Sequence, residues 1–82
     1  MDANDVIVKI DETVNNHSMP KRVKASLSKV KEEIVDEKQD LAVRVTSAIY
    51  ELDEIANDVN IPMHAKTALW DIISDLEALK GK

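Results

Sequence analysis

The stretch Met19–Ile34, MPKRVKASLSKVKEEI, decides the fold of this chain because the chain carries a second version of it. That second version is Ile61–Leu76, IPMHAKTALWDIISDL, 42 residues further on. The match also extends upstream of both stretches, and it predicts that the protein is built from two similar halves. At this offset the halves share the identities Ile7/Ile49, Asp11/Asp53, Glu12/Glu54, Asn15/Asn57, Pro20/Pro62, Lys24/Lys66 and Leu27/Leu69.

Each half has the pattern of a helical hairpin, because its apolar residues recur every three or four positions. We predict helices over Asn4–Asn15, Pro20–Asp36, Leu41–Asn57 and Pro62–Leu79. Neither hairpin buries its apolar stripe alone, so the two are expected to close face to face. The predicted stripes are Ala3, Ile7, Ile10 and Val14; Val23, Leu27, Val30 and Ile34; Leu41, Val45, Ala48, Leu52, Ile55 and Val59; and Ala65, Leu69, Ile72, Leu76 and Leu79.

The predicted fold is therefore all-α, an antiparallel four-helix up-and-down bundle in a single domain over residues 1–82. Hairpin one covers about 4–36 and hairpin two about 41–79. The alternative is a stack of two HEAT-like repeats, whose usual length matches the period of 42 residues. Two such repeats without capping repeats would leave apolar faces in water.

Polar residues mark the predicted helix ends. Asp2 or Asn4 is positioned to cap the first helix and Asp40 to cap the third. Asn15 is expected to end the first helix in the left-handed conformation. The polar segment Asp36–Asp40 is predicted as a loop, although it lacks Gly and Pro, so one continuous helix through it is the alternative.

Composition narrows the class of protein. The 82 residues include one Gly, two Pro and no Cys, which favours helices over tight-turned β structure and excludes a thiolate metal site. The N-terminal segment lacks the long apolar run of a signal peptide or membrane span. We therefore expect a cytoplasmic protein that does not bind membranes. The net charge of −5 argues against general binding of polyanions.

A set of residues, most of them in the second half, carries the pattern of a known family. These residues are Pro20, Arg22, Ala25, Ala42, Val43, Arg44, Ser47, Ala48, Ile49, Leu52, Asp53, Glu54, Ile55, Asn57, Asp58, Pro62, His64, Thr67 and Trp70. Through them the chain resembles the small archaeal proteins of UPF family 0147, whose activity is not established. The resemblance covers nearly the whole chain and implies a small helical bundle in an archaeal cytoplasm. It implies no activity and no cofactor.

A run of basic residues opens the second predicted helix and suggests an anion site. Cations at a helix N-terminus are unfavourable for the helix dipole, but together with free backbone N–H groups they attract phosphate. Both hairpin loops are expected at this end of the bundle, near His17 and Lys66. The candidate anion-site residues for a phosphate or nucleic acid are Lys21, Arg22, Lys29, Lys31 and His64.

Salt bridges are the alternative explanation for these cations. Asp11–Glu12 stands before the first turn about as far as Lys24 stands after it. The same relation holds between Asp53–Glu54 and Lys66, so ion pairs across each hairpin are expected. Arg44 is likewise expected to pair with an acid of a neighbouring helix.

The chain offers little for metal or catalytic chemistry. Neither His17 nor His64 has a Glu three residues before it, as a di-metal bundle would require. Glu51, Glu54 and Asp58 share a helix face, which is typical of a solvated surface. We predict no catalytic residue, no cofactor and no metal, and hence no enzyme.

Off-stripe apolar residues are the remaining lead. They either close the edge of the core or form an exposed patch for another chain. The candidate interface residues are Trp70, Ile73, Tyr50, Val43 and Met63. The favoured function is a non-enzymatic protein-interaction or adaptor module, with a protein partner or a second copy in a homodimer. The alternatives are an accessory nucleic-acid or anion binder and, third, a small enzyme.

Overall fold

The computed structural model describes residues 2–81, and the chain forms four helices within that range. They are α1 (Ala3–Val14), α2 (Lys21–Val35), α3 (Leu41–Ala56) and α4 (Met63–Lys80). The prediction of an all-α four-helix bundle is confirmed. The segment between α2 and α3 is a loop, so the alternative of one continuous helix is wrong.

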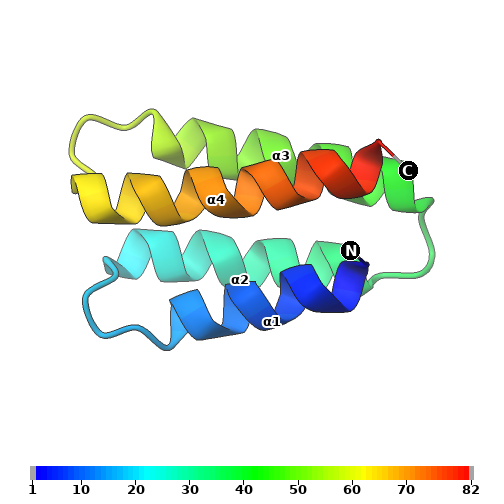
Figure 1. Ribbon diagram of the computed structural model, residues 1–82, viewed down its shortest axis with the longest axis horizontal. Helices are drawn as coiled ribbons and strands as arrows, with labels where there is room; N and C mark the ends of the chain where they lie inside the picture. The colour runs from blue at the N-terminus through cyan, green and yellow to red at the C-terminus, as the bar shows by residue number, and fades with distance from the viewer. Residues whose placement is uncertain (1, 82) are drawn as a thin grey trace.

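The helices run up and down around one core (Figure 1). α1 packs against α2 and α4, and α3 packs against the same two helices. The bundle measures 32 × 21 × 20 Å. Figure 1 shows the α1–α2 and α3–α4 loops at one end, with the α2–α3 loop and both termini at the other. Each hairpin therefore presents one outward surface and covers the apolar stripe of the other.

The core is aliphatic, and every residue of the predicted stripes in α2 and α4 is buried. Two predictions at the ends of the third stripe are wrong, because Leu41 is 38% exposed and Val59 is 90% exposed. Leu41 is the first residue of α3, and Val59 lies beyond its last turn. The most deeply buried large side chains are Val6, Ile10, Val23, Leu27, Val30, Ile34, Val45, Leu52, Leu69, Ile72 and Leu76.

In α1 the predicted stripe is displaced. Val6 is completely buried, whereas Ile7 and Val14 are only partly covered. Val6 precedes Lys9 by one turn, and Lys9 reaches across to α4. α1 therefore turns the Val6 side of its stripe further into the bundle than the sequence pattern predicts.

The three loops share one local structure. In each, the side chain of an Asn or Asp accepts a hydrogen bond from the backbone N–H two residues later, which forms an Asx turn. The acceptors are Asn16, Asp36 and Asp58. The carbonyl of the same residue accepts from the N–H three residues later. This geometry explains how the loop after Asp36 reverses the chain without Gly or Pro.

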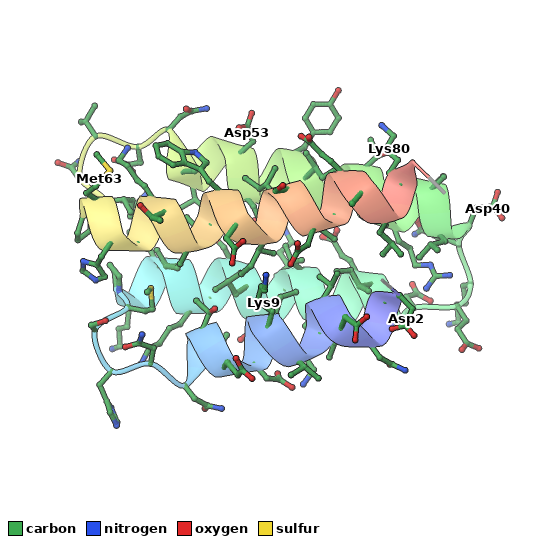
Figure 2. All side chains as sticks on the ribbon, in the orientation of Figure 1. Asp2, Lys9, Asp40, Asp53, Met63 and Lys80 are labelled. Atoms are coloured by element: carbon green, nitrogen blue, oxygen red, sulfur yellow. The ribbon has the colours of Figure 1, made fainter. Side chains whose placement is uncertain are left out.

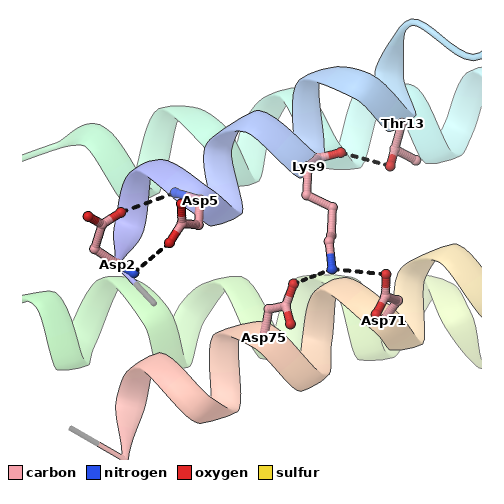
Figure 3. Close-up of polar contacts among 6 residues, drawn as sticks. All are labelled: Asp2, Asp5, Lys9, Thr13, Asp71 and Asp75. Atoms are coloured by element: carbon pink, nitrogen blue, oxygen red, sulfur yellow. Dashed lines mark hydrogen bonds and ion pairs between the residues drawn. The ribbon is translucent and has the colours of Figure 1, made fainter.

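The helix ends differ in part from prediction. Asp2 caps α1 through a reciprocal pair of hydrogen bonds with Asp5, 3.1 and 3.2 Å long (Figure 3). Asp40 occupies the N-cap position of α3, but its side chain makes no capping hydrogen bond there. Asn15 ends α1 at φ −82° rather than in the left-handed conformation, because the Asx turn that follows does not require a positive φ.

Candidate functional site

Besides Leu41 and Val59, four large apolar side chains of hairpin two are exposed. On α3, Val43 is 49% exposed and Tyr50 is 71% exposed. On α4, Met63 is 66% exposed and Trp70 is 47% exposed, so the bundle covers only about half of this single tryptophan. These residues are four of the five candidate interface residues from the sequence.

The fifth candidate, Ile73, is wrong as an exposed residue because it is only 8% exposed. It lies on the side of α4 that meets α3 and belongs to the core. Sequence spacing alone placed it just off the stripe, but the close contact of α3 with α4 covers that flank. Ile73 is therefore a core residue and is not available to contact a partner.

The four exposed residues share one surface. Val43 and Tyr50 are seven residues apart, as are Met63 and Trp70, so each pair lies on one side of its helix. The buried residues of α3 and α4 point the other way, into the bundle. We call the outward surface of hairpin two that carries Val43, Tyr50, Met63 and Trp70 the outer face.

A shallow hollow of about 270 Å³ lies between α3 and α4 on the Tyr50 side of this hairpin. Its lining combines apolar surface with one carboxylate and one ammonium group. It is smaller than the usual pocket for a small molecule but can receive single side chains. The lining residues are Thr46, Ile49, Tyr50, Glu77 and Lys80.

Acids border the outer face. Asp53, Glu54 and Glu77 are exposed, and among residues 2–81 none of them takes part in an ion pair. Figure 2 shows Met63 and Lys80 at opposite ends of α4, with Asp53 pointing outward from α3 between these levels. The rim of the face is thus predominantly anionic.

Three of the five candidate anion-site residues, Arg22, Lys29 and Lys31, are engaged with acids. Lys29 pairs with Glu51 of α3 at 3.5 Å. Lys31 pairs with Asp11 of α1 at 2.8 Å, so these two lysines point to opposite flanks of α2. The two flanks separate the candidate cations instead of gathering them into one patch.

Arg22 lies at 2.5 Å from Asp58, at the end of the bundle where both hairpin loops meet. A backbone N–H of Asn60 is the largest cause, and Arg22 the next, of a lowered pKa for the Asp58 carboxyl. His64 Nε2 lies 2.8 Å from the carbonyl oxygen of Ser18. Lys21 is exposed at the start of α2, and no ion pair of Lys21 occurs within residues 2–81.

The predicted ion pairs across the hairpins have other partners. Asp11 contacts Lys31 and not Lys24, while Lys66 Nζ donates to the backbone carbonyl of Ala56 at 2.9 Å. Arg44 also binds backbone rather than an acid. It donates to the carbonyls of Ile34 at 2.6 Å and Gln39 at 2.9 Å and so closes the end of α2. Charges near helix ends here satisfy unpaired carbonyls.

One pair of ionic contacts involves a lysine that the sequence did not single out. Lys9 of α1 bridges to both Asp75 and Asp71 of α4, with Asp71 at 3.0 Å (Figure 3). The hydrogen bond to Asp75, followed by that to Asp71, raises the pKa of Lys9 above its usual value. The two acids stand four residues apart, which places them on one side of α4. This spacing of Asp71 and Asp75 was the only feature of the sequence that pointed to the contact.

Metal binding and membrane spanning are two further properties that can be read from the arrangement of the side chains and helices. Among residues 2–81, no group of three His, Asp or Glu side chains is arranged to hold a metal ion. Over the same residues, every helix is too short or too polar to cross a membrane.

Comparisons with known proteins identify the family. Residues 2–79 match the model of an uncharacterised protein family, UPF0147. A UPF0147 protein of Methanocaldococcus jannaschii is 40% identical over 75 residues, which cover 92% of this chain and 81% of the relative. One of Thermoplasma acidophilum is 38% identical over 76 residues, covering 93% and 86%.

Solved structures have the same fold. A crystal structure of a UPF0147 protein from Thermoplasma acidophilum superposes with a TM-score of 0.87 at 38% identity, covering 93% of this chain and 89% of that one. A second, of a protein of unknown function, gives 0.83 at 33% identity, covering 92% and 85%. The chain belongs to the archaeal protein family UPF0147, whose function is uncharacterised.

Proposed function

We propose that this protein is a non-enzymatic protein-interaction module that binds a partner through the outer face. The observation that supports this most is the exposure of Trp70 and Tyr50 on one surface of a chain that has no other Trp, Tyr or Phe. Tryptophan and tyrosine are enriched among residues that dominate binding energy at interfaces. A bundle of this size has no structural need to expose both.

Hairpin one serves as an internal comparison for this surface. The positions 42 residues before Tyr50, Met63 and Trp70 hold Val8, Lys21 and Ser28. Val8 is also exposed, at 55%, but it stands without an aromatic neighbour at position 28. The same bundle geometry therefore tolerates small and polar residues at these positions, so Tyr50 and Trp70 are not required by the fold.

The proposal includes a second copy of the chain as one form of partner. It leaves the anion-binding alternative with less support, because Arg22, Lys29 and Lys31 each face an acid. An anion would have to compete with these contacts at each position. Catalysis has no comparable support, since the sequence offers no nucleophile motif and the outer face is largely apolar.

Photo-crosslinking tests the proposal directly. Tyr50 is replaced by the photoreactive amino acid p-benzoylphenylalanine in cells of the source organism, and Val8 of hairpin one is replaced in the same way as the matched control. Both positions are exposed, so both variants should fold. We expect covalent adducts from position 50 that are lost with Trp70→Ala, and none from position 8.

Light scattering over a dilution series, with Trp70 fluorescence on the same samples, separates the two kinds of partner. A homodimer raises the mass with concentration and shifts Trp70 emission to the blue. A different partner gives an adduct of unlike mass while the purified protein stays monomeric. A monomer without adducts from either position would refute the proposed function.

A further inference from the structure

We propose that the partner on the outer face is a cationic amphipathic helix of another protein. This inference rests on the proposed function and assigns the chemistry of the partner. Its basis is the combination of the four exposed apolar residues with an acidic rim, within a chain of net charge −5. Apolar surface supplies binding energy, and the rim selects the sign of the partner's charge.

The rim is available for such pairing. Asp53 and Glu54 are exposed on α3, and Glu77 is exposed on α4, and none of them forms an ion pair within residues 2–81. The other acids of the two helices are already engaged, since Glu51 contacts Lys29, and Asp71 and Asp75 contact Lys9. Glu77 lies beside Tyr50, and Glu54 borders the outer face on the side toward α2, where it lines a hollow with Arg22.

The shape of the surface suits a helix. The exposed apolar residues of α3 lie toward the α2–α3 loop, and those of α4 lie toward the α3–α4 loop, so the two rows follow one another along the length of the hairpin. The hollow beside Tyr50 receives a side chain, with Tyr50 of α3 on one wall and Glu77 of α4 on the other. A helix laid along these rows presents apolar residues at spacings of three and four, and lysine or arginine beside them reaches the rim.

Charge disfavours a second copy as the occupant. In a two-fold dimer each patch meets itself, so Asp53, Glu54 and Glu77 of one copy would approach the same acids of the other. Lys80 is the one basic residue in the hollow and offsets only part of this repulsion. A cationic partner removes the repulsion and replaces it with attraction.

A synthetic helix provides the probe. It contains about 18 residues, the length of α4, in which leucine repeats at spacings of three and four and lysine fills the other positions. The peptide has no aromatic residue, so Trp70 emission reports on its binding without interference. A peptide with glutamate in place of lysine is the control. We expect the lysine peptide to saturate at one copy per protein and to shift Trp70 emission to the blue.

Matched charge variants separate the outer face from net charge. Glu54→Gln with Glu77→Gln neutralises two acids of the rim. Glu12→Gln with Glu32→Gln makes the same change in charge on exposed acids of hairpin one, where Glu12 is the counterpart of Glu54. We expect the rim pair to weaken peptide binding about three- to tenfold and the hairpin-one pair to change it less than about twofold.

The outcomes distinguish failure of this inference from failure of the proposed function. Equal weakening by both pairs, or equal binding of both peptides, would show that only net charge or only apolar contact matters, and either result overturns the inference. Adducts from position 50 that prove to be a second copy, or an acidic segment, would overturn it too while leaving the interaction function in place. If position 50 gives no adducts at all, both the proposed function and this inference are refuted.

Discussion

The two hairpins turn through closely matching loop backbones but carry different surfaces. Asn15 and Asn57 end α1 and α3 at φ −82° and −85°, and Pro20 and Pro62 precede α2 and α4 at φ −60° and −61°. Both loops contain the same Asx turn. Beside its central stripe, hairpin one is crossed by the Lys31–Asp11 ion pair, whereas hairpin two carries Ile73 and Trp70 at the counterparts of Lys31 and Ser28.

This difference shows which residues the bundle requires. Positions that face the centre are apolar in both hairpins, because each hairpin covers the other. Positions at the flank between paired helices accept either an ion pair or an aliphatic side chain. Outward positions are free of structural constraint, so the aromatic residues there point to a role outside the fold. Matched substitutions at counterpart positions test each of these statements.

The largest loss of stability is expected from substitutions at the centre of the core, where Leu27 and Leu69 are both completely buried. Leu27→Ala and Leu69→Ala each remove buried methyl groups and leave a cavity, which costs about 2–5 kcal/mol of unfolding free energy. Because one core serves both hairpins, the two variants should lose similar stability in a single transition. Urea denaturation followed by far-UV circular dichroism measures this. Two separate transitions would show that the hairpins unfold independently.

The flank between paired helices provides the second test. Ile73→Lys exchanges a residue that is 8% exposed for a cation, and burial of an isoleucine side chain contributes about 1.5–3 kcal/mol. We expect a loss of about 1–3 kcal/mol in urea denaturation. The reverse change, Lys31→Ile, removes a half-exposed ion pair and should alter stability by less than about 1 kcal/mol. Equal losses would contradict the view that hairpin two depends on apolar contact here.

The fold could be predicted from the sequence to a large extent, because each hairpin repeats apolar residues at helical spacing. In α4 the predicted stripe, from Ala65 to Leu79, is the buried one. The spacing gave the period but not the rotation of each helix about its axis. Rotation depends on the neighbours, which is why the buried residues Val6 and Ile73 lie outside the predicted stripes.

The candidate surface was predicted less completely, for the same physical reason. Trp70 and Tyr50 were identified as residues beside the stripes, since spacing alone places them off the core. The partners of Lys31, Arg44 and Lys66 were not, because a long side chain selects among groups that tertiary packing brings near. Two of these three residues bind backbone carbonyls, which no pattern of charges in the sequence reveals.

A smaller effect is expected where only hairpin two ties down a helix end. Lys66 Nζ donates to the carbonyl of Ala56, the last residue of α3. Lys66→Met keeps most of the apolar stem but removes this charge-assisted hydrogen bond, so a loss of about 1–2 kcal/mol is expected. Lys24→Met at the counterpart position should be nearly neutral, since Lys24 makes no side-chain hydrogen bond to Val14 within residues 2–81. Thermal unfolding of both variants decides this, and equal shifts in Tm would contradict it.

The smallest expected effect on stability is a dependence on pH, which should be present in the α3–α4 loop and absent from the α1–α2 loop. Asp58 and its counterpart Asn16 accept the same Asx-turn hydrogen bond, but only Asp58 titrates. The Asn60 N–H and Arg22 lower the pKa of Asp58 in the folded protein, so its carboxylate stabilises the fold above its ordinary pKa of about 4. This stabilisation is lost as the pH falls below about 4 and through the lowered pKa of Asp58 in the folded protein.

Asp58→Asn should therefore be less stable than the wild type at pH 7 and should approach it as the pH falls below 4, when Asp58 itself is protonated. Urea denaturation at pH 7, 5 and 3 measures the difference. Asn16→Asp is the matched control, because it introduces a carboxylate into the same turn of hairpin one. A constant difference between Asp58→Asn and the wild type across this range would assign the contribution of Asp58 to loop geometry rather than to charge.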